Sequence, residues 1–225
     1  MHLFALCPAM SIPIDDEDVP SPIDFHDPAQ ARAWEEHTIR IRPFRPHFFA
    51  AFVSALKENL AGPIAVLELG SGPGHLAEQI LLHCHVRRYA ALDFSAAMHA
   101  IARERLASFE DRMEHVIRDF RSPDWPDGLG YFDAVVTLQA AHETRHRRHL
   151  LPLLRTARAC LRPDGLLLYC DHYAEAGSEK NPALYIAHES QPAVLEEAGF
   201  HRVRELRNEG GMALYSCRNP SGGLA

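Results

Sequence analysis

The sequence predicts an α/β domain in which helices cover both faces of a mostly parallel sheet. Short apolar runs with the length of buried strands alternate with stretches in which apolar residues recur at helical spacing. That alternation is typical of parallel strands joined by right-handed crossovers. The second observation is the glycine loop Gly70–Gly74, which follows the apolar run Ile64–Leu69 and precedes a helical stretch that includes Leu76 and Ile80. Strand, glycine turn and helix in this order indicate a doubly wound, ligand-binding sheet.

Composition and charge limit the class of protein. The chain has 225 residues, of which 47% are hydrophobic and 24% charged, which suits one domain with one sizeable core. Its formal charge of −7 supplies no positive field for a polyanion, so a nucleic-acid partner is not expected. No run approaches the ~18 apolar residues of a membrane span. The opening residues 1–8 lack a basic region and are too short for a secretory signal, so we expect a cytoplasmic protein without a membrane partner.

The N-terminal quarter differs in composition from the rest. Residues 1–28 are expected to form a flexible arm, because residues 11–28 are rich in proline and acidic side chains. Residues 29–60 are expected to be helical, with an interruption at Pro43 and Pro46. We predict that this helical region covers one edge of the sheet and serves as a lid over a ligand. Residues 29–225 then form a single domain.

The remaining elements follow from apolar runs and turn signals. Further strands are expected at 89–93, 113–120, 131–138, 166–170, 201–206 and 212–217, and a helix at 184–198 that Gly199 ends. Asp93 ends its strand about 20 residues beyond the glycine loop, where an acid accepts hydrogen bonds from a ribose. The alternative is that Asp93 caps the next helix, a role that Ser95 can also fill.

The glycine loop resembles a known motif. Its spacing is GxGxG led by Glu68, which differs from the GxGxxG of dinucleotide-binding proteins. It is similar to motif I of the class I S-adenosylmethionine-dependent methyltransferases, and the turn at 163–165 also resembles that superfamily. The resemblance covers about residues 45–218. It implies a seven-stranded sheet in the order 3-2-1-4-5-7-6 with the last strand antiparallel, and S-adenosylmethionine as cofactor.

The resemblance also implies a set of cofactor-binding residues. In these methyltransferases the acid at the position of Asp119 accepts the adenine amino group, and the next backbone N–H donates to the ring. Phe120 can flank the base, and Glu68 suits the cationic portion of the cofactor. The full expected set is Glu68, Gly70, Ser71, Gly72, Gly74, Asp93, Phe94, Asp119, Phe120 and Gln139.

Residues 142–146 also match HExxH, the zinc motif of metallopeptidases. In that interpretation His142 and His146 bind the metal while Glu143 polarises a bound water. The motif here begins at the end of a predicted strand instead of inside a helix, and Glu175 is the only obvious third ligand further on. We therefore expect no metal, and a zinc hydrolase is kept as an alternative function.

Two histidines follow the carboxyl ends of neighbouring strands, where ligands bind in doubly wound sheets. His142 follows the fourth strand and His172 the fifth. A histidine can accept a proton near neutral pH, so both are candidate catalytic bases. The alternative for each is a hydrogen-bonded scaffold role.

The expected function is methyl transfer from S-adenosylmethionine to an oxygen or nitrogen atom of a small-molecule acceptor, by in-line displacement. The fourth strand does not end in the Asn/Asp-Pro-Pro-Tyr/Phe signature of the amino-methylating nucleic-acid enzymes. Methylation of a protein stays open. A non-catalytic S-adenosylmethionine-binding protein is the other alternative, since cofactor residues can persist without an acceptor pocket.

Overall fold

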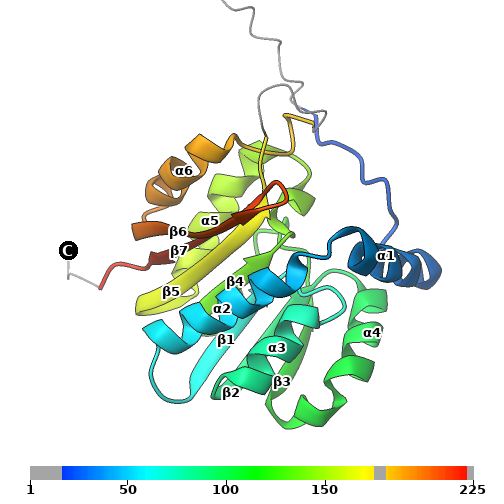
Figure 1. Ribbon diagram of the computed structural model, residues 1–225, viewed down its shortest axis with the longest axis horizontal. Helices are drawn as coiled ribbons and strands as arrows, with labels where there is room; N and C mark the ends of the chain where they lie inside the picture. Colours follow the sequence, from blue (N-terminus) through cyan, green and yellow to red (C-terminus); the bar gives the residue numbers. More distant parts are fainter. Residues whose placement is uncertain (1–16, 175–180, 222–225) are drawn as a thin grey trace, which may run out of the picture.

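Seven strands form one sheet in a computed structural model that describes residues 17–174 and 181–221 (Figure 1). The sheet order is β3-β2-β1-β4-β5-β7-β6. The pairs β3–β2, β2–β1, β1–β4 and β4–β5 are parallel, while β7 runs antiparallel to both β5 and β6. The expected strand order is confirmed. The strands are β1 (Ile64–Leu69), β2 (Val86–Asp93), β3 (Met113–Ile117), β4 (Phe132–Leu138), β5 (Leu161–His172), β6 (His201–Glu209) and β7 (Met212–Arg218).

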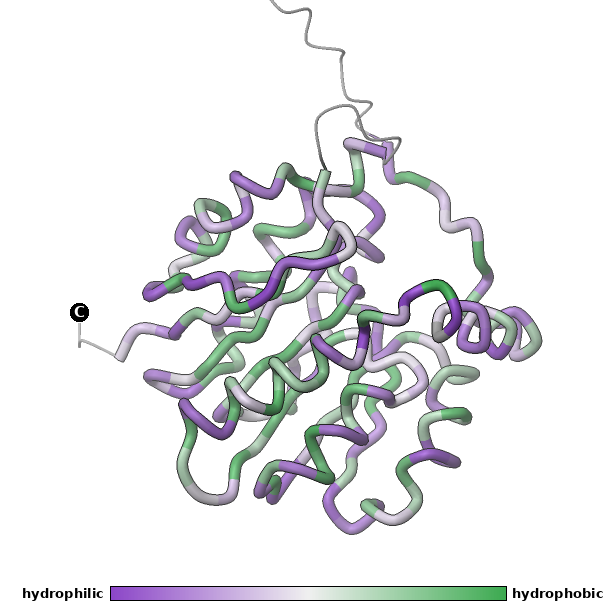
Figure 2. Tube along the Cα trace, in the orientation of Figure 1, coloured by the Kyte–Doolittle hydropathy of each residue, from purple (hydrophilic) through white to green (hydrophobic). Residues whose placement is uncertain are grey.

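Helices cover both faces of the sheet and leave the strands inside. Phe48 and Phe52 of α2 pack in one core cluster with Ile80 of α3, and the second cluster contains Leu153 of α5 and Leu195 of α6. Figure 2 shows the central strands as largely hydrophobic, whereas the edge strand β6 is largely hydrophilic. The α-helices are α1 (Pro28–Ile41), α2 (Arg45–Asn59), α3 (His75–His83), α4 (Ala96–Leu106), α5 (Leu150–Ala159) and α6 (Gln191–Glu197). No helix of the described residues is long and apolar enough to cross a membrane.

Several predicted boundaries differ from the structure, because β2, β5, β6 and β7 are longer than expected and two further elements are shorter. The third strand ends at Ile117, before the expected acid at 119. The predicted helix 184–198 is shorter, because α6 begins at Gln191 with a proline in its first turn, which is where proline is tolerated. The pairing of β4 with β5 jumps from Leu161 to Leu166, so the predicted turn at 163–165 interrupts β5.

The N-terminal segment lies against the rest of the domain. Val19 N donates to Arg145 O at 2.8 Å, and Ser95 Oγ donates to Phe25 O. Ala31 of α1 packs in a small cluster with residues of α4, and the bend between α1 and α2 falls at Arg42. The predicted arm covers residues 1–28, of which residues 1–16 lie outside the described part of the chain.

The described cysteines are free thiols. Cys160, Cys170 and Cys217 are buried in the sheet and its helices, while Cys84 at the end of α3 is partly exposed. Burial raises the pKa of Cys160 to about 11. The three buried thiols are therefore protonated and shielded from solvent in the folded protein.

Candidate active site

A cavity opens at the carboxyl ends of β1, β2 and β4, and we call it the main cavity. Its volume is ≈ 820 Å³, counting space open to solvent. Of the residues predicted from sequence, it is lined by Glu68, Gly70, Ser71, Gly72, Asp93, Phe94, Phe120, Gln139 and His142. Gly74, Asp119 and His172 do not line it. Most of the predicted site therefore meets in one place.

The glycine loop forms the floor of the main cavity. Gly70 has φ +69°, and a Cβ at this position would overlap the Ala140 Cβ at the end of β4. Gly72 has φ +52°, but a Cβ there would meet no heavy atom within 4 Å. Gly70 is thus required by packing, whereas Gly72 leaves its backbone open to a ligand. Gly74 caps α3 with φ +82°.

Asp93 ties the glycine loop to the next helix. Its Oδ2 accepts from Gly72 N and its Oδ1 from Ser95 N, each at 2.8 Å. The helix cap itself is Ser95, whose side chain accepts from Met98 N. A carboxylate offers about four lone-pair sites, so Asp93 retains acceptor capacity toward the cavity. Ser95 therefore fills the capping role that was the alternative for Asp93, and the ribose-binding role of Asp93 stays a prediction.

Glu68 is a buried carboxyl group in the wall of the main cavity. It is 2% exposed, and its Oε2 accepts from the Tyr89 hydroxyl at 2.7 Å. Burial raises the pKa of Glu68 to about 8. The group is mostly neutral at pH 7 without a cationic partner, and a bound ammonium would favour its ionised form.

Two arginines at the bend between α1 and α2 also line the main cavity, and sequence reasoning missed both. Neither Arg42 nor Arg45 forms an ion pair within the described residues. Arg45 is 9% exposed, and burial lowers its pKa to about 10. Its Nε is buried without a hydrogen-bond partner, as are Ser71 Oγ and Gln139 Oε1. Buried polar atoms normally have partners, so these three orphaned atoms fit a polar, partly anionic ligand.

The aromatic side chains lie at the β2 and β3 end of the cavity. Phe94 and Phe120 line it, together with Phe25, which packs edge-on against Phe94 at 6.2 Å between ring centroids. Asp119 instead binds Arg121, whose Nη2 donates to Asp119 Oδ2 at 2.7 Å. Two flat hydrophobic faces suit a purine base, and the carboxylate next to them already has a cationic partner.

His142 forms a buried pair with a carboxylate that sequence reasoning did not single out. Its Nδ1 lies 2.7 Å from Asp171 Oδ1, and its backbone N donates to Asp171 Oδ2 at 2.9 Å. Its Nε2 lies 3.3 Å from Glu143 Oε1. Burial lowers the pKa of His142, but the two carboxylates outweigh burial and raise it to about 10. The imidazole therefore holds its proton at neutral pH and becomes a strong base when it loses it.

His172 faces a smaller cavity beside the main one. Its Nε2 lies 3.0 Å from Gln139 Nε2, and it lines a cavity of ≈ 230 Å³ together with Tyr185 and His142. The His142 and His172 rings are 5.7 Å apart between centroids, and the Tyr185 ring lies 5.5 Å from that of His142. His142 thus lines both cavities.

The HExxH segment does not form a continuous helix. Residues Ala141–Thr144 make a 3-10 turn, and Arg145 adopts φ +66°. His142 and His146 therefore do not share a helix face, and His146 Nδ1 accepts from Arg148 N. No group of three or more histidine, cysteine or acidic side chains within residues 17–174 and 181–221 could hold a metal ion. Glu175 lies outside the described residues.

Comparison with known sequences points to one class of enzyme. Residues 66–165 match the family described as a methyltransferase domain. The chain is also 30% identical over 109 residues to the non-reducing polyketide synthase adrD of Penicillium roqueforti. That match spans 46% of this chain but only 4% of the synthase, so it concerns a small part of a much longer protein.

Solved structures share the fold at low sequence identity. An O-methyltransferase family protein from Burkholderia thailandensis is 19% identical with a TM-score of 0.68, over 88% of this chain and 62% of that one. The CurJ carbon methyltransferase is 20% identical with a TM-score of 0.61, over 73% and 51%. The N-methyltransferase NodS of Bradyrhizobium japonicum, solved with S-adenosyl-L-homocysteine, is 17% identical with a TM-score of 0.62, over 78% and 87%. Residues 66–165 thus match a methyltransferase domain, and the chain shares the seven-stranded fold of solved methyltransferases.

Proposed function

We propose that this protein transfers a methyl group from S-adenosylmethionine to an oxygen or nitrogen atom of a small-molecule acceptor. The observation that supports this most is the position of the His142–Asp171 pair, in the wall of the cavity that the glycine loop and Asp93 also line. A proton-exchanging group and a nucleotide-binding loop thus face the same space, which is the arrangement expected of a transferase site.

The residues around the main cavity match the parts of the cofactor. S-adenosylmethionine supplies a methyl group on a cationic sulfur that departs as a neutral thioether. In our proposal Asp93 accepts from the ribose hydroxyls, and Phe94 and Phe120 flank the adenine. Glu68 accepts from the methionine ammonium, and Arg45 with its orphaned Nε binds the carboxylate.

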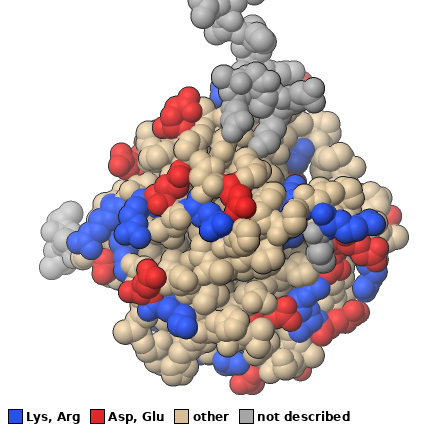
Figure 3. Space-filling view, in the orientation of Figure 1, with Lys and Arg blue, Asp and Glu red and all other residues tan. Residues whose placement is uncertain are grey.

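His142 provides the acceptor side. Asp171 fixes its Nδ1, so Nε2 is the nitrogen left to meet an acceptor. There it can take a proton from a hydroxyl or protonated amine, or hold the resulting anion. The acceptor atom must then lie within ~3–3.5 Å of the methyl carbon that it attacks. A small acceptor fits this site because α1 and residues 17–27 border the cavity. Positive and negative side chains are interspersed on the face in Figure 3, which offers no basic surface for a nucleic acid.

A carbon acceptor is a second candidate. The carbon methyltransferase among the similar structures favours it. A carbon acid between two carbonyl groups needs a strong base, and the raised pKa of His142 meets that need. Because O-, N- and C-methyltransferases share this fold, only the acceptor site can select among them.

Two measurements test the proposal in sequence. Calorimetric titration should show binding of S-adenosylmethionine and of S-adenosylhomocysteine but not of NAD. Labelled methyl donor is then offered with phenols, amines and β-ketothioesters. Transfer to a phenol or amine supports the proposal, and transfer to a β-ketothioester alone supports the carbon candidate. Binding without turnover on any acceptor would favour a non-catalytic protein. One bound zinc per chain that is lost in His146→Ala would instead favour the zinc-hydrolase interpretation.

A further inference from the structure

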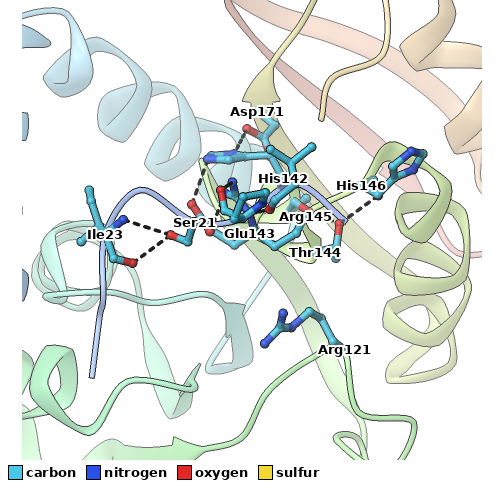
Figure 4. Close-up of polar contacts among 12 residues, drawn as sticks. Ser21, Ile23, Arg121, His142, Glu143, Thr144, Arg145, His146 and Asp171 are labelled. Carbon is cyan, nitrogen blue, oxygen red and sulfur yellow. Dashed lines mark hydrogen bonds and ion pairs between the residues drawn. The ribbon is translucent and has the colours of Figure 1, made fainter. Parts of the chain in front are cut away.

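A continuous polar chain connects the N-terminal segment to the His142–Asp171 pair (Figure 4). Arg145 Nε donates to Val19 O and Arg145 Nη2 to Pro20 O, each at 2.8 Å. Its third branch, Nη1, donates to Glu143 Oε2 at 3.0 Å. The other oxygen of Glu143 lies 3.3 Å from His142 Nε2. One guanidinium therefore contacts both the segment bordering the main cavity and the neighbour of the candidate base.

Arg145 is held firmly in this position. It is 7% exposed, so its charge-assisted bonds are screened little by water. Its backbone has φ +66°, a conformation that is uncommon for a non-glycine residue. That backbone directs Arg145 O toward Val19 N, 2.8 Å away, while the side chain reaches inward. A strained residue at a functional site points to a role for its position.

Glu143 has two cationic partners that compete for it. Glu143 Oε1 faces the one nitrogen of His142 that Asp171 leaves available. An acceptor can reach His142 Nε2 only when Glu143 yields that place. Arg145 offers Glu143 an alternative partner, and Arg145 is oriented for this by the carbonyls of Val19 and Pro20.

We propose that Arg145 is a positioning residue that holds Glu143 away from full engagement with His142 and does so when residues 18–20 are seated on it. Seating of the N-terminal segment, whose Phe25 lines the main cavity, is thereby linked to the readiness of His142. This inference rests on the proposed function for its effect on turnover. Its effect on the protonation of His142 does not depend on any acceptor.

The protonation of His142 depends on every charged group that faces it. Removing the positive charge of Arg145 leaves Glu143 free to pair with His142, so the pKa of His142 should rise further. The facing groups are Asp171 and His172 from β5, Glu143 and Arg145 from the segment after β4, Tyr185 from the loop after β5, and Arg42 from the bend between α1 and α2. Arg145 also donates to the backbone carbonyls of Val19 and Pro20.

The test compares Arg145→Gln with a matched control. Arg148→Gln removes an ion pair to Asp18 of the same N-terminal segment, 2.7 Å long, without touching Glu143. Nitrogen-15 NMR of the full chain with S-adenosylhomocysteine follows the titration of His142. We expect Arg145→Gln to move that titration to higher pH and Arg148→Gln to leave it unchanged. Val19→Pro, which deletes the bond from Val19 N to Arg145 O, serves as a milder second variant if Arg145→Gln folds poorly.

Kinetics on the identified acceptor supply the second readout. Arg145→Gln should lower kcat by at least about ten-fold while changing cofactor Kd by less than about three-fold. In a His142→Ala background, Arg145→Gln should cause no further loss, because it acts through His142. An unchanged His142 titration, or losses that simply add in the double variant, would overturn the inference. Absence of methyl transfer by the unaltered protein would instead count against the proposed function.

Discussion

The pKa values of two buried cationic side chains of the site are shifted in opposite directions. Burial, with the nearby charge of Arg42, lowers the pKa of Arg45 to about 10 although Glu68 opposes this, whereas Asp171 and Glu143 raise the pKa of His142 to about 10. Arg45 forms no ion pair among the described residues, and His142 lies beside two carboxylates. Each arrangement leads to a measurement on a single residue.

Replacing Arg45 should separate stability from binding. Arg45→Met removes an unpaired buried charge, so the ligand-free protein should unfold at a higher temperature than the unaltered one. The same change should weaken S-adenosylhomocysteine binding about ten-fold or more, because the ligand carboxylate loses a charge-assisted partner. Thermal unfolding and calorimetry measure the two effects. A variant that is less stable yet binds normally would show that Arg45 has a structural role only.

Replacing Asp93 should weaken the cofactor site. Asp93→Ala loses bonds to the ribose and should cost about 1.5–3 kcal/mol, or roughly ten- to a hundred-fold in affinity. Because Asp93 also accepts from Gly72 N and Ser95 N, some stability will be lost with it. Glu114→Gln, which removes a carboxylate from the exposed pair with Arg88, is the matched control. Normal cofactor affinity in Asp93→Ala would reduce this residue to a loop anchor.

The raised pKa of His142 predicts how turnover depends on pH. A base must be unprotonated to act, and the unprotonated fraction of a group with a pKa of about 10 grows nearly ten-fold per pH unit below that value. We therefore expect kcat/KM for a neutral phenol to increase from pH 7 toward pH 10. His142→Ala should flatten this increase and lower kcat at least ~10-fold, with cofactor Kd changed less than ~3-fold. A profile that is flat in the unaltered protein would exclude His142 as the base.

The elements of the fold differ in how far the sequence determines them. The glycine loop, Asp93 and the apolar strands are local patterns, and the structure confirms the sheet they predict. The two cavity arginines lie at the interruption around Pro43 that the sequence shows within the predicted lid, but nothing in that pattern marks either as a ligand-binding residue. Their surroundings come from α2 folding back across the sheet, which no local pattern reveals.

For the candidate base, too, the sequence shows the local position but not the contact that folding makes. The position of His142 after a strand end makes it a candidate, but its partner Asp171 lies on a different strand, directly before His172. Spacing cannot show which carboxylate meets which imidazole. Asp119 likewise binds Arg121 two residues later, a contact that spacing does not show, and its role toward adenine stays a prediction.

Two glycines of the same loop should respond differently to alanine. Gly70→Ala places a Cβ against the Ala140 Cβ and keeps an unfavourable φ, so it should cost about 2–5 kcal/mol and lower Tm by roughly 5 °C or more. Gly72→Ala meets open space and should cost only about 1–2 kcal/mol. Its methyl group projects where the ligand is expected, so its cofactor affinity should fall instead. Equal thermal stability of the two variants would contradict this assignment.

At the scale of the whole molecule, buried ionisable groups set the pH of greatest stability. Burial is the main cause that lowers the pKa of His75 and of His115 to about 4, so below pH 6.5 the unfolded state binds more protons and stability falls. The raised pKa values of Glu68 and His142 act in the opposite sense, so their contributions decline as pH rises toward about 8 and about 10.

The ligand-free protein should therefore be most stable near pH 6.5. Urea denaturation at pH 5, 6.5 and 9 measures this, because the unfolding free energy should be lower at both extremes than at the centre. His115→Gln should reduce the loss between pH 6.5 and 5. A free energy that keeps increasing from pH 6.5 to pH 9 would contradict the raised pKa values.

The buried thiols can also report how often the folded chain opens locally. Cys170 and Cys217 face each other's strands across the β5–β7 pair and are at most 1% exposed. A thiol reagent can modify them only during excursions that separate those strands. The labelling rate of these two thiols, measured separately from that of the partly exposed Cys84, therefore reports such excursions without an engineered probe. A ligand that binds only the folded chain makes them rarer, so slower labelling would register cofactor binding before any acceptor is known.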